Sequence, residues 1–180
     1  MSTARKLLVA TPEMLDPNFV RCVILMIEHD EKGALGVVLT QPTGLELRDL
    51  LPAWGEVAAP PSNVFRGGPV SPEVAITLAD APGDPPSDFM PIVGNVGLVD
   101  AGQPPESMGG VLRARVFSGY SGWTAGQLEF ENVAKSWFVV EPNTDDPFDP
   151  EPDTLWDRVL TRQKGLLSWY VDFPDRPELN

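Results

Sequence analysis

The chain has 180 residues, a formal net charge of −13 and a sequence pI near 4.3. A chain of this length fits one domain, residues 1–180, and buries a core without a metal or disulfide. Its acidic surface repels phosphate backbones and anionic lipids, so we expect no direct contact with nucleic acid or membranes. Cys22 is the single cysteine, which excludes an intrachain disulfide and a cysteine-based zinc site.

Two short apolar runs bear on targeting and membrane insertion. The run at residues 7–10 ends before Pro12 and is too short for the core of a signal peptide. The run at residues 22–27 is far below the length of a membrane span. We therefore expect an untargeted, cytoplasmic protein.

The N-terminal part of the chain predicts strands before any helix. Residues 7–10 predict a short strand, and residues 21–29 and 34–40 predict a hairpin that is apolar on both faces. Pro42 breaks this pattern, and an amphipathic pattern at residues 45–51 then predicts a short helix.

The remainder of the chain mixes strands and helices irregularly. Helices are expected at residues 124–134 and after Asp153, which can cap the last helix. This irregular mixture predicts an α+β fold, in which a mixed, mainly antiparallel sheet is flanked by a few helices. Residues 141–153 hold six acids and four prolines and predict a solvated, acidic, proline-rich connector. Further strands are expected at residues 63–66, 74–79, 94–100, 111–117 and 136–141, with a proline-rich loop at 80–91.

Two glycine-rich motifs, Gly67-Gly68-Pro69-Val70 and Gly119-Tyr120-Ser121-Gly122-Trp123, each follow a predicted strand. Glycine-rich turns leave backbone N–H groups open, so they can hold an anion or a substrate. They also occur where a chain simply turns. The first motif lacks the Gly-Lys-Ser/Thr of a phosphate-binding loop. Both interpretations stay open.

The second motif has the spacing of a hydrolase nucleophile elbow, G-x-S-x-G, around Ser121. Its last position is Trp123 in place of glycine, and His29 is the one histidine that can serve as the base. We therefore do not favour serine hydrolysis. Thr124 and Gln127 instead predict a capping box, and Trp123 predicts a hydrophobic staple with Leu128. This accounts for the second half of the motif and leaves its glycines unexplained.

Few residues have the chemistry of a metal or cofactor site. His29 lies between Glu28 and Asp30, which can hold an imidazolium, and a structural histidine is the competing interpretation. One histidine and one cysteine in an apolar run are too few for a transition-metal site. The acidic segment lacks the spacing of a calcium loop. We expect no metal and no cofactor.

Several motifs in order resemble the AlgH/YqgE-like family of small bacterial proteins, and the resemblance covers nearly the whole chain. It implies an α+β fold with a mixed sheet between helices, and it implies no settled activity. Part of the family carries a transcriptional-regulator label. The matching residues are Leu8-Val9-Ala10, Pro12, Asp16, Phe19, Glu28-His29, Gly33 to Val38, the two glycine motifs, Gly126-Gln127-Leu128-Glu129 and Trp137.

Two departures from the family pattern bear on function. The chain has Thr40-Gln41-Pro42 where the family has Asn-Arg/Lys-Pro, which removes groups that an anion site there would use. It has Ser121 where the family usually has alanine, which counts against a catalytic serine.

The leading hypothesis is a non-enzymatic binding or adaptor protein with an indirect regulatory role, which contacts another protein or a small ligand. The alternative is an enzyme or small-molecule binder with a site between the two glycine turns and His29. A DNA-binding regulator ranks third because of the negative charge. The candidate surface comprises His29, Arg66, Gly67, Gly68, Gly119, Gly122 and Trp123.

Overall fold

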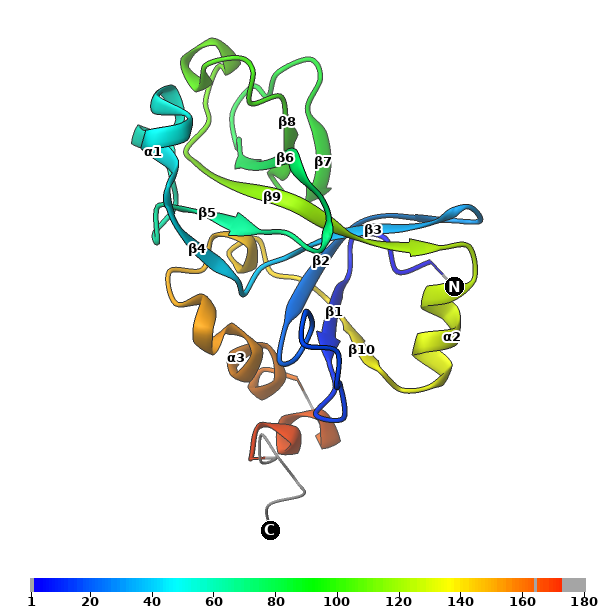
Figure 1. The fold of residues 1–180 in the computed structure, drawn as a ribbon. Coiled ribbons are helices and arrows are strands. Elements are labelled where there is room, and N and C mark those ends of the chain that lie inside the picture. Colours follow the sequence, from blue (N-terminus) through cyan, green and yellow to red (C-terminus); the bar gives the residue numbers. More distant parts are fainter. Residues whose placement is uncertain (1, 164, 173–180) are drawn as a thin grey trace.

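A curled sheet organises the computed structural model, which describes residues 2–163 and 165–172 (Figure 1). Its strands are β1 (Leu7–Ala10), β2 (Val23–Asp30), β3 (Gly33–Val38), β4 (Pro42–Glu46), β5 (Asn63–Arg66), β6 (Val70–Asp80), β7 (Met90–Val93), β8 (Val96–Val99), β9 (Arg113–Thr124) and β10 (Trp137–Val140). The α-helices are α1 (Leu47–Leu50), α2 (Gln127–Val133) and α3 (Leu155–Thr161). The 3-10 helices are η1 (Pro52–Val57), η2 (Pro105–Met108), η3 (Asp146–Phe148), η4 (Pro152–Thr154) and η5 (Gly165–Asp172).

The strands follow the spatial order β10-β1-β2-β3-β9-β6-β8-β7, and β5 lies between β9 and β4. All strand pairs are antiparallel except β5 with β9, which is parallel. The predicted α+β class with a mainly antiparallel sheet is therefore confirmed.

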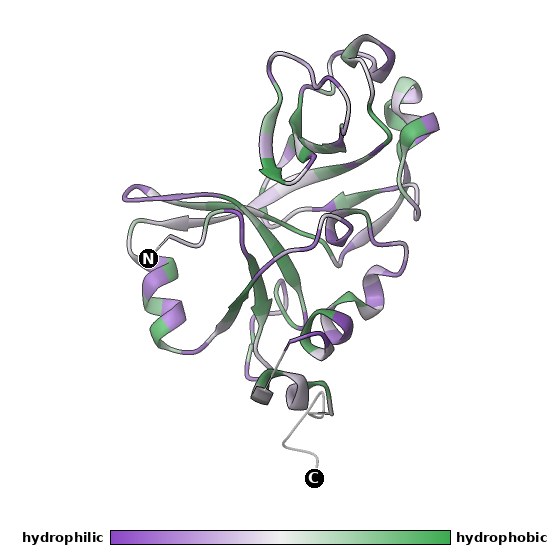
Figure 2. Cartoon of the chain, turned by 180° about the vertical axis from the view of Figure 1, so that it is seen from behind, coloured by the Kyte–Doolittle hydropathy of each residue, from purple (hydrophilic) through white to green (hydrophobic). Residues whose placement is uncertain are grey.

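Both faces of the β1–β3 part of the sheet are covered, as predicted. Leu7 and Val9 face the larger core, to which α3 contributes Trp156. Leu8, one position along, faces a smaller core that includes Leu128 of α2. Figure 2 shows these central strands in hydrophobic colours. Burial on both faces explains why β1 is apolar throughout and β2 is apolar at residues 23–27.

β4 and β7 both fall where the sequence predicts loop or helix. β4 begins at Pro42 and takes up part of the predicted helix, of which α1 alone remains. β7 contains Pro91 and begins inside the predicted proline-rich loop. β4 pairs only with β5, and β7 ends the main strand order. Proline is tolerated in such edge strands because their outward N–H groups need no partner.

β9 is much longer than predicted and joins the two halves of the sheet. Its residues 113–118 and Tyr120 pair with β6, and its residues 121–124 pair with β3. The second glycine motif therefore lies inside a strand, not in a strand-to-helix turn. Gly119, with a φ of 69°, lies where β9 changes from pairing with β5 to pairing with β3.

The helix starts differ in detail from the predicted caps. The backbone N–H of Thr124 donates to the Gln127 side chain over 3.1 Å, which is one half of the predicted capping box. The N-cap position of α2 is instead Gly126 in a left-handed conformation, because Thr124 still belongs to β9. α3 follows directly on η4, so its N-cap residue is Thr154 and not Asp153.

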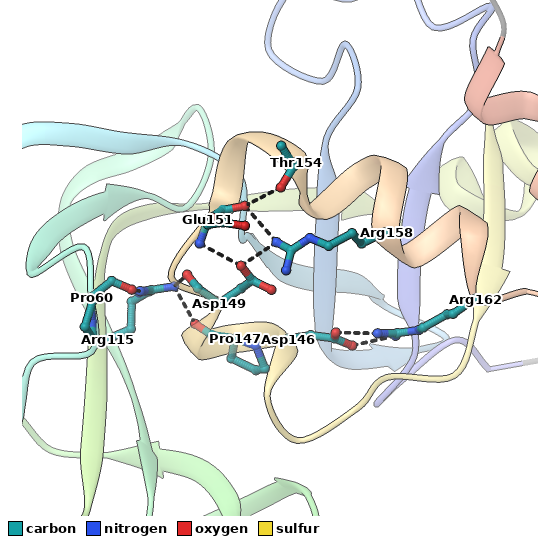
Figure 3. A network of polar contacts seen from close by, with 9 residues as sticks. All are labelled: Pro60, Arg115, Asp146, Pro147, Asp149, Glu151, Thr154, Arg158 and Arg162. Atoms are coloured by element: carbon teal, nitrogen blue, oxygen red, sulfur yellow. Dashed lines mark hydrogen bonds and ion pairs between the residues drawn. The ribbon is translucent and has the colours of Figure 1, made fainter.

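The acidic segment 141–153, for which a solvated connector is expected, packs on the protein at residues 146–148 and Pro152, and most of its other residues are exposed. Asp146 is 4 % exposed, and both its oxygens accept hydrogen bonds from Arg162 over 2.6 Å (Figure 3). Arg158 donates to Asp149 over 2.5 Å. Composition alone indicates a solvated segment because its neutralising arginines lie elsewhere in the sequence.

Arg115 of β9 fixes this segment from the sheet side. Its side chain is almost fully buried, and its guanidinium lies 4.1 Å from the centre of the Phe65 ring. Burial disfavours the charged guanidinium and lowers the pKa of Arg115 to about 10. The guanidinium nevertheless donates hydrogen bonds to several backbone carbonyls. Figure 3 shows it between the two segments that it joins. Its nitrogens donate to the carbonyls of Ala59, Pro60, Pro147 and Asp149.

Cys22 is fully buried in the smaller core. Burial disfavours the thiolate and raises the pKa of this thiol far above its usual value. The thiol therefore acts as a small apolar group, as its apolar neighbours predict.

We expect the free energy of unfolding to fall as the pH rises above about 8.5, by up to about 1.4 kcal/mol per pH unit. The folded state keeps the Cys22 proton at a pH where the unfolded chain has lost it, so alkaline pH favours unfolding. Urea unfolding from pH 7 to 10 measures this slope. Cys22→Ala removes this contribution, and equal slopes for both proteins would contradict it.

Candidate functional site

The two glycine motifs meet, as the alternative hypothesis requires. The N–H of Gly67 donates to the carbonyl of Ser118 over 2.9 Å, and the Gly67 carbonyl accepts the Val38 N–H over 2.9 Å. The Ser121 hydroxyl donates to the same carbonyl over 3.1 Å. We call this backbone contact of residues 67–68 with residues 118–121 the glycine crossing.

The glycine crossing leaves no space for a ligand between the two motifs. A Cβ on Gly67 would lie 2.3 Å from the Gly119 carbonyl oxygen, and one on Gly68 would lie 2.2 Å from the Tyr120 carbonyl carbon. A Cβ on Gly119 would lie 2.7 Å from the Val70 carbonyl oxygen. Backbone contact between the motifs thus accounts for these glycines, because any side chain would force the strands apart.

Ser121 lies inside this contact. Its side chain is fully buried, and its hydroxyl proton is directed at the Gly67 carbonyl. A nucleophile needs a base and an approach path for substrate, and Ser121 has neither of these in its described contacts. This geometry favours a structural role for the residue.

His29 lies away from the glycine crossing and ties the N-terminal segment to α2. Its Nδ1 accepts the backbone N–H of Thr3 over 2.9 Å, and its Nε2 lies 2.8 Å from Glu129 Oε1. A backbone N–H can only donate, so Nδ1 carries a lone pair and Nε2–H donates to Glu129. The expected contact with Glu28 and Asp30 is thus replaced by one with a distant glutamate.

Glu129 responds to these contacts. A backbone hydrogen bond and the hydrogen bond from His29 hold its pKa below the usual range. The carboxylate therefore stays ionised, near the positive end of α2. Figure 1 shows α2 beside the N-terminus, where this contact lies.

Trp123 belongs to a second contact of α2, which we call the Glu131 clasp. The indole N–H groups of Trp123 and Trp137 donate to Glu131 Oε2 over 2.9 and 2.8 Å. The Gln127 side chain donates to Oε1 over 3.0 Å. The clasp joins α2 to β9 and β10, and it leaves Trp123 6 % exposed.

Beside the glycine crossing lies an open groove of about 570 Å³, which we call the hairpin groove. The carboxylates of Glu28 and Asp30 line it together with the apolar or aromatic groups of Leu35, Val70 and Tyr120. The groove thus combines an apolar floor with negative charge. Gly122 and Trp123 also line it, which places two of the predicted site residues there.

The predicted surface residues therefore separate into different places. Gly67, Gly68 and Gly119 are buried in the glycine crossing, whereas Gly122 is exposed at the groove. Arg66 is exposed and donates to the side chain of Asn18 over 2.9 Å, away from the residues that line the groove.

Sequence reasoning missed Glu131 and Trp137 as partners of Trp123. Trp137 follows the second motif at the spacing that the family resemblance quotes, so a signal for it was present. Glu131 gives no such signal, because its role depends on two indoles from different strands.

Among the residues that the structure describes, no three His, Cys, Asp or Glu side chains are grouped as metal ligands. None of the described helices has the length and apolar character that crossing a bilayer requires.

This fold and surface define a curled α+β protein in which glycine motifs hold two parts of one sheet together. Residues 7–168 match the family model described as AlgH-like (DUF179). A UPF0301 protein of Streptomyces avermitilis is 45 % identical over 185 residues, covering 99 % of this chain and 96 % of the relative. A UPF0301 protein of Streptomyces coelicolor is 44 % identical with the same coverage. The chain belongs to the AlgH-like family, as its motifs predict.

Two solved structures share the fold. A crystal structure of a Corynebacterium diphtheriae protein matches with a TM-score of 0.89 at 27 % identity, covering 96 % of this chain and 93 % of that protein. The solution structure of the AlgH protein from Pseudomonas aeruginosa matches with a TM-score of 0.68 at 27 % identity, covering 94 % and 93 %.

We expect Gly68→Ala to lower the free energy of unfolding by about 3 kcal/mol or more, because the new Cβ meets backbone atoms that cannot move aside. Gly44→Ala is the matched control, since a Cβ at Gly44 has open space around it. It should change stability by less than about 1 kcal/mol. Chemical denaturation measures both, and equal effects would contradict the tight contact.

Proposed function

We propose that this AlgH-like protein is a non-enzymatic adaptor that binds a basic, partly apolar segment of a partner protein in the hairpin groove. The observation that carries the proposal is the pairing of two exposed carboxylates, Glu28 and Asp30, with an apolar floor in one open groove of about 570 Å³. Clefts that combine apolar walls with a few charged groups are typical of recognition sites.

The charge of the groove supports a cationic partner. Glu28 and Asp30 are exposed at the hairpin, and the chain as a whole carries a net charge of −13. Such a field attracts lysine- and arginine-bearing segments and repels phosphate groups. Lys32 also lines the groove, so acidic side chains outnumber basic ones there by one.

The apolar floor supports a protein partner that contributes side chains. Leu35, Val70 and Tyr120 come from three different strands and line one groove. Each is only partly buried, so each still has surface that a partner's apolar side chain can cover. The charge at the edge of the groove and the apolar contact at its floor together favour a partner segment in which basic and apolar side chains alternate.

The glycine crossing supports binding over catalysis. Backbone contact occupies the space between the motifs that an active site there would need. An adaptor without nucleic-acid contact acts on gene expression only through its partner, which agrees with an indirect regulatory role.

The test places a photo-crosslinking amino acid at Lys32, which is exposed and lines the groove. Cross-linking in the host cell should trap one partner through a peptide that contains lysine or arginine. The purified partner should then bind about tenfold more weakly to Glu28→Gln/Asp30→Asn, because two attractive charges are lost.

The matched control is Glu106→Gln/Asp100→Asn, which removes the same charges far from the groove. Asp100 accepts the Gly102 N–H as Asp30 accepts the Lys32 N–H, so both aspartates hold similar turns. The control should bind like the native protein. Asp84, which is exposed and does not line the groove, is the control position for the photo-crosslinking amino acid. Equal binding by both charge variants, or no cross-linked product from position 32 beyond that formed from position 84, would refute the groove as the binding site.

A further inference from the structure

A second hollow, of about 240 Å³, shares Gly122 and Trp123 with the hairpin groove and is otherwise lined by different residues. It is lined by Asp16 and Phe19 from the loop before β2, by Glu131 of α2 and by Trp137 of β10. The loop before β2, helix α2 and strand β10 together supply the aromatic rings and carboxylates of this small hollow.

Glu131 is held in this hollow by neutral donors alone. Its Oε2 accepts two indole N–H groups, from Trp123 and Trp137, and its Oε1 accepts one amide N–H from Gln127. These bonds fix the orientation of the carboxylate and do not cancel its charge. A carboxylate oxygen has room for two hydrogen bonds, so Oε1 can accept one more donor.

Asp16 adds a second uncompensated charge. Its Oδ1 accepts the backbone and side-chain N–H groups of Asn18 over 2.9 and 3.1 Å, and both donors are neutral. Within residues 2–163 and 165–172, neither Asp16 nor Glu131 forms an ion pair with lysine or arginine. The other oxygen of Asp16 is available to a donor.

Three aromatic side chains also line the hollow. Phe19, Trp123 and Trp137 form a mutual contact with ring centres 5.7 to 6.4 Å apart. Aromatic rings attract cations through their quadrupole, and the attraction strengthens where water is excluded. A ligand with a positive head and a short apolar body matches both kinds of wall.

We propose that this hollow binds a protonated alkylamine, with the ammonium between Asp16 and Glu131 and the carbon chain against the aromatic rings. The volume of about 240 Å³ limits the ligand to a small amine or to one lysine side chain. Both sources share the same alkylammonium chemistry. The inference stands on the Glu131 clasp and does not depend on the hairpin groove.

The test follows the indole N–H signals of Trp123 and Trp137 by NMR while n-butylammonium chloride replaces sodium chloride at constant ionic strength. Both indoles donate to Glu131, so a bound ammonium should shift both signals together. A dissociation constant on the order of 1 mM is expected for so small a ligand. The Trp54 indole, which donates to the Ala101 carbonyl, should not move.

Variants distinguish the ammonium contact from general filling of the hollow. Asp16→Asn keeps the acceptor for Asn18 and removes one charge, so it should weaken binding at least threefold. Glu131→Gln should abolish saturable shifts, and its amide spectrum reports whether it remains folded. Glu106→Gln, a charge-matched control in η2, should bind as the native protein does.

Two further titrations complete the test. 1-Butanol has the same carbon chain without the charge, and equal shifts with it would overturn the proposal. N-acetyl-lysine amide represents the lysine source, and tighter binding than n-butylammonium would assign the hollow to a protein side chain; weaker binding would assign it to a free amine. No saturable shift with either amine up to about 50 mM, or an unchanged affinity of Asp16→Asn, would also overturn it.

Discussion

Direct backbone contact at the glycine crossing is the constraint on which the rest of this structure depends. Gly67 and Gly68 lie against Gly119 and Tyr120 so closely that no side chain fits at the three glycines. At this point β9 changes from pairing with β5 to pairing with β3, while its pairing with β6 extends to Tyr120. One strand can therefore serve both halves of the sheet, and the curled shape follows from the bend at Gly119.

The crossing also determines where ligands can bind. Because backbone fills the space between the motifs, accessible surface lies beside them, around Gly122 and Trp123. Glu129 and Glu131 of α2 accept hydrogen bonds from His29, Trp123 and Trp137. These bonds hold the helix against one face of the sheet. The glycine motifs and Ser121, which suggest catalysis in the sequence, are thus packed in the crossing, and the two hollows that we propose as cation-binding sites lie beside it.

Local patterns predict the parts of this fold that depend on local interactions. Continuous apolar runs predict the β2–β3 hairpin, and the start of α2 falls close to its predicted place. The course of β9 is not predictable in this way, because three glycines usually indicate a turn and only the partner strands keep the segment extended. The packing of the acidic segment at residues 146–148 is equally unpredictable from local sequence, since Arg115 and Arg162 reach it from distant positions. For the site, Trp123 was predictable and its carboxylate partner was not.

Native-state hydrogen exchange of the Gly67 and Val38 amides tests the central claim most directly. The Gly67 N–H donates within the glycine crossing, to the Ser118 carbonyl, and the Val38 N–H of β3 donates to the Gly67 carbonyl. If the crossing holds the sheet together, both amides exchange only through global unfolding, and their exchange free energies agree with the denaturation value within about 1 kcal/mol. Exchange through a local opening several kcal/mol below the global value would contradict the account, because the motifs would then form a turn that can open.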